Sequence, residues 1–120
     1  MSKNFLIVDD SLVSRMMTKS VIGKLRPDWV FFEANTGMQA IATCAQQPID
    51  IVCMDLNMPG ITGIEAAAEI HKHNPAIRIT IMTANIQSAI QSKIQQHGLA
   101  FMAKPLTESK GPELLKVLGE

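Results

Sequence analysis

Short, uninterrupted apolar runs alternate along this chain with longer segments in which apolar residues recur every three or four positions. Apolar runs closed by turn residues are typical of strands that are buried on both faces of a sheet. We therefore predict strands at residues 5–8, 29–32, 51–54, 77–82 and 99–103. The third run leads directly to Asp55, and the turn residues Asn57-Met58-Pro59-Gly60 follow at once.

The segments between these runs have the period of amphipathic helices. We predict helices at residues 12–25, 36–47, 62–73 and 86–97, and a last helix that includes residues 114–118. In the first helix Val13, Met17, Val21 and Leu25 recur at every fourth position. We expect this face to point inward, with Met16 beside it.

Two helix starts need a capping residue. Ser11 is expected to cap the first helix, and Asp10 is expected to share that role. The start of the last helix stays open between two choices. Thr107 is a plausible cap, whereas Gly111-Pro112 would place the helix start there, with proline at its first position.

Strands that alternate with helices predict βαβ crossovers with right-handed connections. The chain is therefore expected to form an α/β fold, in which five parallel strands are covered by five helices. The alternation runs from about residue 4 to about residue 118, without an internal repeat or a linker. We expect a single domain over residues 1–120.

The composition excludes several classes of partner. Lys and Arg together number 11, as do Asp and Glu, so no net charge favours nucleic acid or an anionic membrane. The chain has no apolar run of membrane-spanning length and no signal-peptide pattern. Its two cysteines, Cys44 and Cys53, lack metal-ligand spacing and are expected to be buried reduced thiols in a cytoplasmic protein.

Polar side chains follow the predicted strands where each one ends. Asp9 and Asp10 follow the first strand, Asp55 the third, Thr83 the fourth and Lys104 the fifth. The carboxyl ends of parallel strands meet at one edge of a sheet, which is where ligands bind. Two carboxylates about 4 Å apart repel each other by roughly 4 kcal/mol near a protein surface, so three of them favour either protonation of one acid or a bound cation.

Hard oxygen ligands with room for water suit Mg²⁺, and a backbone carbonyl near Asn57 would add another oxygen. The same edge would also carry the ammonium of Lys104, the hydroxyl of Thr83 and backbone N–H groups near Ala84. A cation, a point charge and hydrogen-bond donors are what a phosphoryl group needs. Asp55 is then placed as a nucleophile that forms an acyl phosphate.

This combination resembles the response-regulator receiver domains of the CheY type over essentially the whole chain. The matching motifs are Asp9-Asp10, Asp55 with Met58-Pro59-Gly60 and Gly63, Thr83-Ala84, and Lys104-Pro105. Each motif is weak alone, but together, each at the end of the right strand, they are highly specific. The resemblance implies a flavodoxin-like, doubly wound sheet with the strand order 2-1-3-4-5.

The resemblance also implies a role for each of these residues. Asp55 would accept phosphate from a phosphohistidine of a sensor histidine kinase or phosphotransfer protein, or from a small phosphodonor. Asp10, Asp55 and the Asn57 carbonyl would bind Mg²⁺, or Mn²⁺ in its place, and Asp9 would assist through water. Lys104 would contact a phosphate oxygen, held by what is usually a cis peptide bond to Pro105.

A change of conformation would follow in such a domain. Thr83 would move toward the phosphate, and Phe101, where chemotaxis regulators commonly have Tyr, would turn inward behind it. Asn57 and Asn85 would flank the path of attacking water and tune the phosphate lifetime. The face formed by the fourth helix, fifth strand and fifth helix would dock a downstream protein, and the chain would be a monomer or a phosphorylation-dependent dimer.

Other functions remain as alternatives. An aspartyl phosphatase would carry Asp-x-Asp after the first strand, whereas Asp9 and Asp10 are adjacent. A flavin or nucleotide module would need a phosphate loop rich in Gly, Ser and Thr, and two acids there would repel a phosphate. The chain would thus be a phosphoacceptor switch and not an enzyme acting on a metabolite. It would be a stand-alone regulator, a receiver excised from a longer regulator, or a phosphorylation-independent binding module.

Overall fold

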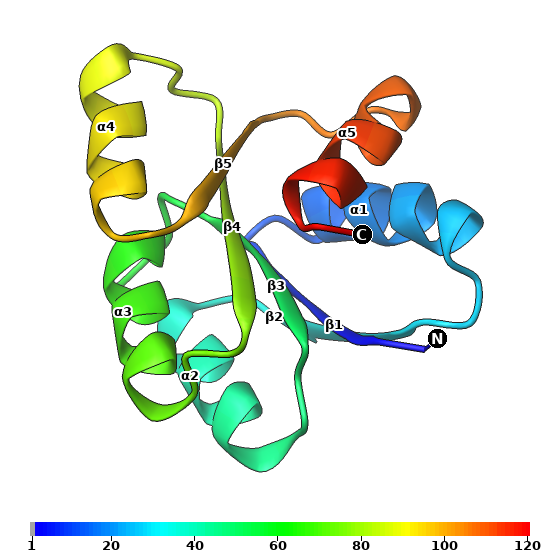
Figure 1. The fold of residues 1–120 in the computed structure, drawn as a ribbon, viewed down its shortest axis with the longest axis horizontal. Helices are drawn as coiled ribbons and strands as arrows, with labels where there is room; N and C mark the ends of the chain where they lie inside the picture. The colour runs from blue at the N-terminus through cyan, green and yellow to red at the C-terminus, as the bar shows by residue number, and fades with distance from the viewer. Residues whose placement is uncertain (1) are drawn as a thin grey trace.

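The computed structural model describes residues 2–120 and contains one parallel five-stranded sheet with the order β2-β1-β3-β4-β5 (Figure 1). The strands are β1 (Asn4–Val8), β2 (Val30–Ala34), β3 (Ile51–Asp55), β4 (Arg78–Thr83) and β5 (Ala100–Ala103). The helices are α1 (Leu12–Leu25), α2 (Gly37–Gln46), α3 (Gly63–His73), α4 (Ser88–Gln96) and α5 (Gly111–Val117). A short 3₁₀ turn, Glu108–Lys110, precedes α5. The predicted fold class and strand order are confirmed.

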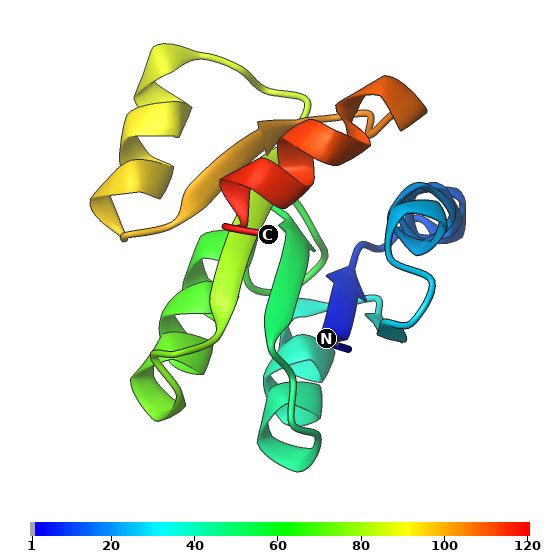
Figure 2. The same cartoon turned by 45° about the vertical axis from the view of Figure 1, so that its right-hand side comes forward.

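Two apolar cores lie on the two faces of the sheet, as expected when crossover helices cover both. Alternate residues of each strand feed opposite cores, so that Leu6 and Val8 of β1 face one side while Phe5 and Ile7 face the other. Helices α2, α3 and α4 cover the first face, and α1 and α5 cover the second (Figure 2). β3 is buried along its whole length, because it lies at the centre of the sheet.

Several predicted boundaries shift by one or two residues. β2 begins after Trp29 and extends through Glu33 and Ala34, because these two residues pair in register with the last residues of β1. Of the two predicted starts for the last helix, Thr107 and Gly111, the structure has Gly111, which begins α5 with proline in its first turn. Within residues 2–120, no helix is long and apolar enough to cross a membrane.

The predicted inward face of α1 is wrong except at Val21, because Leu25 at the end of the helix is also 37% exposed. Val13 is 66% exposed, Met16 60% and Met17 39%, whereas the buried positions of this helix are Thr18, Val21 and Ile22. An α-helix has 3.6 residues per turn, so a stripe with a strict four-residue step advances about 40° around the axis at each step. The stripe therefore meets the core only near Val21 and leaves it toward both ends of the helix.

Candidate functional site

Four strands bring the predicted polar residues to one edge of the sheet. Asp9 follows β1, Asp55 is the last residue of β3, Thr83 is the last residue of β4, and Lys104 follows β5. β3 and β1 are neighbours in register, so that Met54 lies beside Val8 and the acids that follow are brought together. The distances below show that Asp9, Asp10, Asp55 and Lys104 converge as expected.

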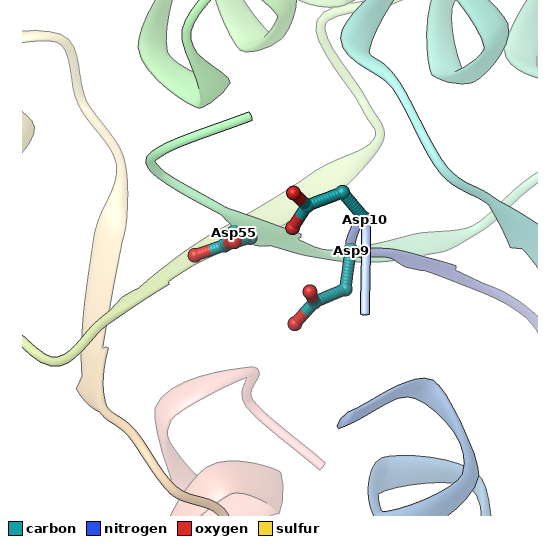
Figure 3. A group of neighbouring side chains, drawn as sticks. All are labelled: Asp9, Asp10 and Asp55. Carbon is teal, nitrogen blue, oxygen red and sulfur yellow. The ribbon is translucent and has the colours of Figure 1, made fainter. Parts of the chain in front are cut away.

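Three carboxylates form a compact cluster at this edge. One oxygen each from Asp9, Asp10 and Asp55 lies within 4.8 Å of the others. Figure 3 shows Asp9 and Asp10 leaving the end of β1 and Asp55 leaving β3 beside them. Asp9 and Asp55 are 6% and 9% exposed, whereas Asp10 is exposed to solvent. Two acids of the cluster, Asp9 and Asp55, are therefore buried, and Asp10 is open to solvent.

Lys104 is the cation of this cluster. Its Nζ lies 2.7 Å from Oδ2 of Asp9 and 3.5 Å from Oδ1 of Asp55. The backbone N–H of Lys104 donates to the carbonyl of Thr83 at 3.0 Å, which ties the residue to the neighbouring strand. The bond from Lys104 to Pro105 is cis, as the resemblance implied. The ammonium thus lies between the first and third strands although it comes from the fifth.

Burial and charge set the protonation of these groups. The pKa of Asp55 is raised from its ordinary value of 3.8, because burial disfavours the carboxylate and outweighs the attraction of Lys104, and Asp9 and Asp10 raise it further. Burial lowers the pKa of Lys104, but its hydrogen bond to Asp9 and the charges of both acids reverse the balance and raise it overall. The ionised form of Asp55 is therefore less favourable here than in water, and a second cation would stabilise it.

The turn after β1 uses Asp9 rather than Asp10. Ser11 caps α1 by accepting the N–H of Ser14, as predicted. Among residues 2–120, Asp10 makes no cap to α1, and Asp9 instead accepts the N–H of Ser11 at Oδ1, at 2.9 Å. Within the described range 2–120, the Asp10 carboxylate has no hydrogen bond to the protein, which leaves its oxygens free for a ligand.

The segment from Asp55 to Gly63 forms a loop whose two ends lie close together. The N–H of Gly63 donates to the carbonyl of Leu56 at 2.9 Å, so α3 begins against the end of β3. A Cβ on Gly63 would overlap the carbonyl oxygen of Asp55, which explains glycine at this position. Thr62 and Glu65 cap α3 reciprocally. Met58 and Pro59 lie in this turn, and Gly60 has a φ of 86°, which favours glycine.

Thr83 and Phe101 lie on neighbouring parallel strands, where Thr83 pairs with Ala103 and Phe101 pairs with Ile81. Thr83 is 1% exposed, and its Oγ1 accepts the N–H of Asn85 at 3.0 Å. Ala84 and Asn85 are exposed beyond it. Phe101 is partly buried against the core under α2, α3 and α4. The threonine hydroxyl is therefore held by its own loop and not by the acids.

The residues present fit a hard divalent cation. The cluster offers carboxylate oxygens from three side chains, and Asp10 gives it an open side where water ligands have room. Asn57, whose carbonyl was predicted as a further ligand, is exposed in the turn after Asp55. An all-oxygen donor set of this kind suits Mg²⁺ or Mn²⁺ better than soft metals.

Arg15 contacts this site although it was not among the predicted site residues, and Glu33 holds Arg15 in turn. Arg15 of α1 donates from Nη1 to the carbonyl oxygen of Asp9 at 2.6 Å, and its Nε donates to Oε1 of Glu33 on β2 at 3.0 Å. The one available signal was a charged residue inside the otherwise apolar first half of the helix. His71 of α3 is partly buried, with Nε2 2.8 Å from the carbonyl oxygen of Ile77, and lies outside the site.

Comparison with known proteins gives the class. The family model described as the response regulator receiver domain matches residues 5–116. This chain belongs to that family. Receiver domains of this family are phosphoacceptor switches that interact with histidine kinases or phosphotransfer proteins, and they generally bind Mg²⁺.

Three relatives show the range of this similarity. The chemotaxis protein CheY of Thermotoga maritima is 37% identical over 116 residues, which cover 96% of each chain. The response regulator UvrY of Escherichia coli K12 is 31% identical over 97 residues, which cover 81% of this chain but 44% of UvrY. The chain thus spans less than half the length of that relative. The structure of CheY4 from Vibrio cholerae has a TM-score of 0.88 at 21% identity over 98% of this chain and 99% of that one, which shows the fold.

Proposed function

We propose that residues 1–120 form a single receiver domain in which Asp55 accepts a phosphoryl group in a Mg²⁺-dependent reaction. The observation that carries the proposal is the convergence of Asp9, Asp10, Asp55 and Lys104 at one edge of the sheet. Structural acids would be spread over the surface or paired one to one. Three carboxylates around one ammonium leave an excess of negative charge that a divalent cation offsets.

The chemical step needs only groups of this chain and a phosphodonor. A carboxylate oxygen of Asp55 attacks phosphorus, a new P–O bond forms, and the bond to the donor breaks. For a phosphohistidine donor, the electron pair of the broken P–N bond stays on the imidazole. Lys104 and the N–H groups near Ala84 stabilise charge on the phosphoryl oxygens. When bound, Mg²⁺ would be held by Asp10, Asp55 and the Asn57 carbonyl and would supply positive charge to the same oxygens.

The first half of α1 suits a protein donor. Leu12, Val13, Met16 and Met17 form an exposed apolar patch directly after the acids, with exposed fractions of 58%, 66%, 60% and 39%. An exposed cluster of this kind is typical of a contact surface for another protein. A histidine kinase or phosphotransfer helix that covered this patch would bring its phosphohistidine to Asp55. We name Leu12, Val13, Met16 and Met17 the α1 patch.

The phosphoryl group would act on the rest of the domain through Thr83. It adds a charge near −2 and new acceptor oxygens at the mouth of the site. Thr83 would turn its hydroxyl toward them, and Phe101 would repack behind it and alter the face formed by α4, β5 and α5. That face would bind the downstream protein, either on a stand-alone regulator or within a longer one. Asn57 and Asn85 would tune how fast water removes the phosphate.

The test is intact mass after incubation with acetyl phosphate, with and without Mg²⁺. A phosphoryl adduct that requires Mg²⁺ and is absent in Asp55→Asn is the expected result. The matched control is Asp28→Asn, because Asp28 is an exposed aspartate outside the cluster. A folded wild-type protein that gains no adduct under either condition would overturn the proposal and leave a phosphorylation-independent binding module.

A further inference from the structure

Arg15 is a largely buried cation beside the acid cluster. Its side chain is 15% exposed, although it lies on α1 between the exposed residues Val13 and Met16. The guanidinium reaches from α1 to the carboxyl ends of β1 and β2. Nη1 donates to the carbonyl oxygen of Asp9 at 2.6 Å, and Nε donates to Oε1 of Glu33 at 3.0 Å. Arginine suits this task, because its rigid fork places two donors at a fixed angle.

The contact completes a set of hydrogen bonds that holds every polar atom of Asp9. Its N–H donates to the carbonyl of Ala34, and its two carboxylate oxygens accept from the N–H of Ser11 and from Nζ of Lys104. Arg15 binds the remaining atom, the backbone oxygen. That oxygen belongs to the peptide group that joins Asp9 to Asp10. The orientation of this peptide fixes where the Asp10 side chain leaves the chain.

The charge of Arg15 would by itself oppose a bound cation. A guanidinium near three carboxylates repels a divalent ion that approaches them. The ion pair with Glu33 moderates this repulsion and holds the fork in place. If Arg15 acts only through its charge, its removal should strengthen Mg²⁺ binding. If it acts by positioning the Asp9–Asp10 peptide, its removal should weaken Mg²⁺ binding, so a measured affinity distinguishes the two roles.

We propose that Arg15 is a positioning residue for the metal site, which acts through the Asp9–Asp10 peptide while Glu33 holds its guanidinium. The proposal rests on the Mg²⁺ site of the proposed function. Arg15 would touch neither the ion nor the phosphoryl group. Its contribution would be to keep the exposed Asp10 carboxylate within reach of the ion that Asp55 also binds. Groups behind metal ligands commonly change metal affinity by about tenfold or more when they are removed.

The experiment is calorimetric titration of Mg²⁺ into the apo protein, without phosphodonor, so that the readout is affinity and not phosphorylation. The variants are Arg15→Gln, Arg15→Lys, Lys19→Gln and Asp10→Asn. Lys19 is an exposed cation on the same helix, so Lys19→Gln repeats the charge change without the contacts. We expect Arg15→Gln to weaken Mg²⁺ binding by about tenfold while Lys19→Gln stays within about twofold of wild type.

Arg15→Lys separates charge from geometry. Lysine keeps the charge but lacks the fork that reaches both acceptors, so we expect binding clearly weaker than in wild type. If Arg15→Gln does not fold, as judged by circular dichroism, Arg15→Lys carries the test with the same direction. Binding in the folded Arg15 variants that equals or exceeds wild type would overturn the positioning role. If wild type binds no Mg²⁺, or Asp10→Asn binds it equally well, the metal site itself is wrong and both proposals fall.

Discussion

Lys104 donates to Asp9 at 2.7 Å and stands farther, at 3.5 Å, from Asp55, the residue that we propose as phosphoacceptor. The shorter contact is to the more buried acid. Lys104 therefore forms two ion pairs, and the longer and weaker of them is the one to Asp55. A phosphoryl group on Asp55 would offer Lys104 new oxygens, so the lysine has two sets of partners between which it can move.

Lys104→Met should destabilise the protein in the absence of metal. It leaves the buried carboxylates of Asp9 and Asp55 without their cation, and we expect a loss of about 2 kcal/mol in the free energy of unfolding. Excess Mg²⁺ should restore most of this loss, because it replaces the missing charge. Urea denaturation with EDTA and with Mg²⁺ measures both. The exposed Lys116→Met is the control, and an equal loss in that variant would contradict the explanation.

Asp55→Asn should stabilise the metal-free protein at neutral pH. The pKa of Asp55 is raised in the folded state, chiefly by burial, so between 3.8 and the folded value the native state holds more protons than the unfolded state. Stability is therefore lost as pH rises through this interval. The amide removes this loss, and we expect a gain of about 1 kcal/mol at neutral pH.

The size of this effect depends on pH. Below pH 3.8, Asp55 is protonated in both states, so the mutant and the wild type should differ little. Thermal denaturation over a pH series with EDTA measures the difference, with Asp28→Asn as the matched control. A mutant that is less stable than wild type at neutral pH, or a gain that persists unchanged into acid, would show that burial of the carboxylate is not the cause.

The α1 patch should be dispensable for folding. Val13→Gln changes a side chain that is 66% exposed and should alter the free energy of unfolding by no more than about 0.5 kcal/mol. Ile22→Ala empties a position that is fully buried in the same helix and should cost about 3 kcal/mol. Urea denaturation of the two variants measures the contrast. Comparable losses in both would mean that the first half of α1 packs against the domain in solution.

Gly63 should be irreplaceable where another helical glycine is not. Alanine at position 63 would overlap the carbonyl of Asp55, so we expect Gly63→Ala to cost about 2 kcal/mol and to reduce phosphorylation by acetyl phosphate. At Gly23 in α1 the nearest atom to an added Cβ is 3.7 Å away, on Phe31, so Gly23→Ala should gain about 0.5 kcal/mol from helix propensity. Unfolding by urea and phosphorylation measured by intact mass compare the two variants. Wild-type behaviour of Gly63→Ala would contradict the contact.

The order of the elements and the convergence of the acids could be predicted from the sequence, because both follow from local patterns. Apolar runs set the strands, and parallel strands bring their ends to one edge. The buried side of α1 could not be predicted, because a four-residue step fits two turns of a helix well but drifts around a longer one. Arg15 could not be assigned either, since its partners are a backbone oxygen and a residue from another strand.

The hydrogen bond from Gly63 to Leu56 makes the turn after Asp55 a closed loop whose two ends meet. Compact loops with adjacent ends can change length or sequence without displacing the elements that carry them. An exposed position of this loop such as Pro59 can therefore change while Gly60, Thr62 and the acceptor stay in place. The outline that the loop presents to a partner can thus evolve at such a position without moving the acids at the strand ends.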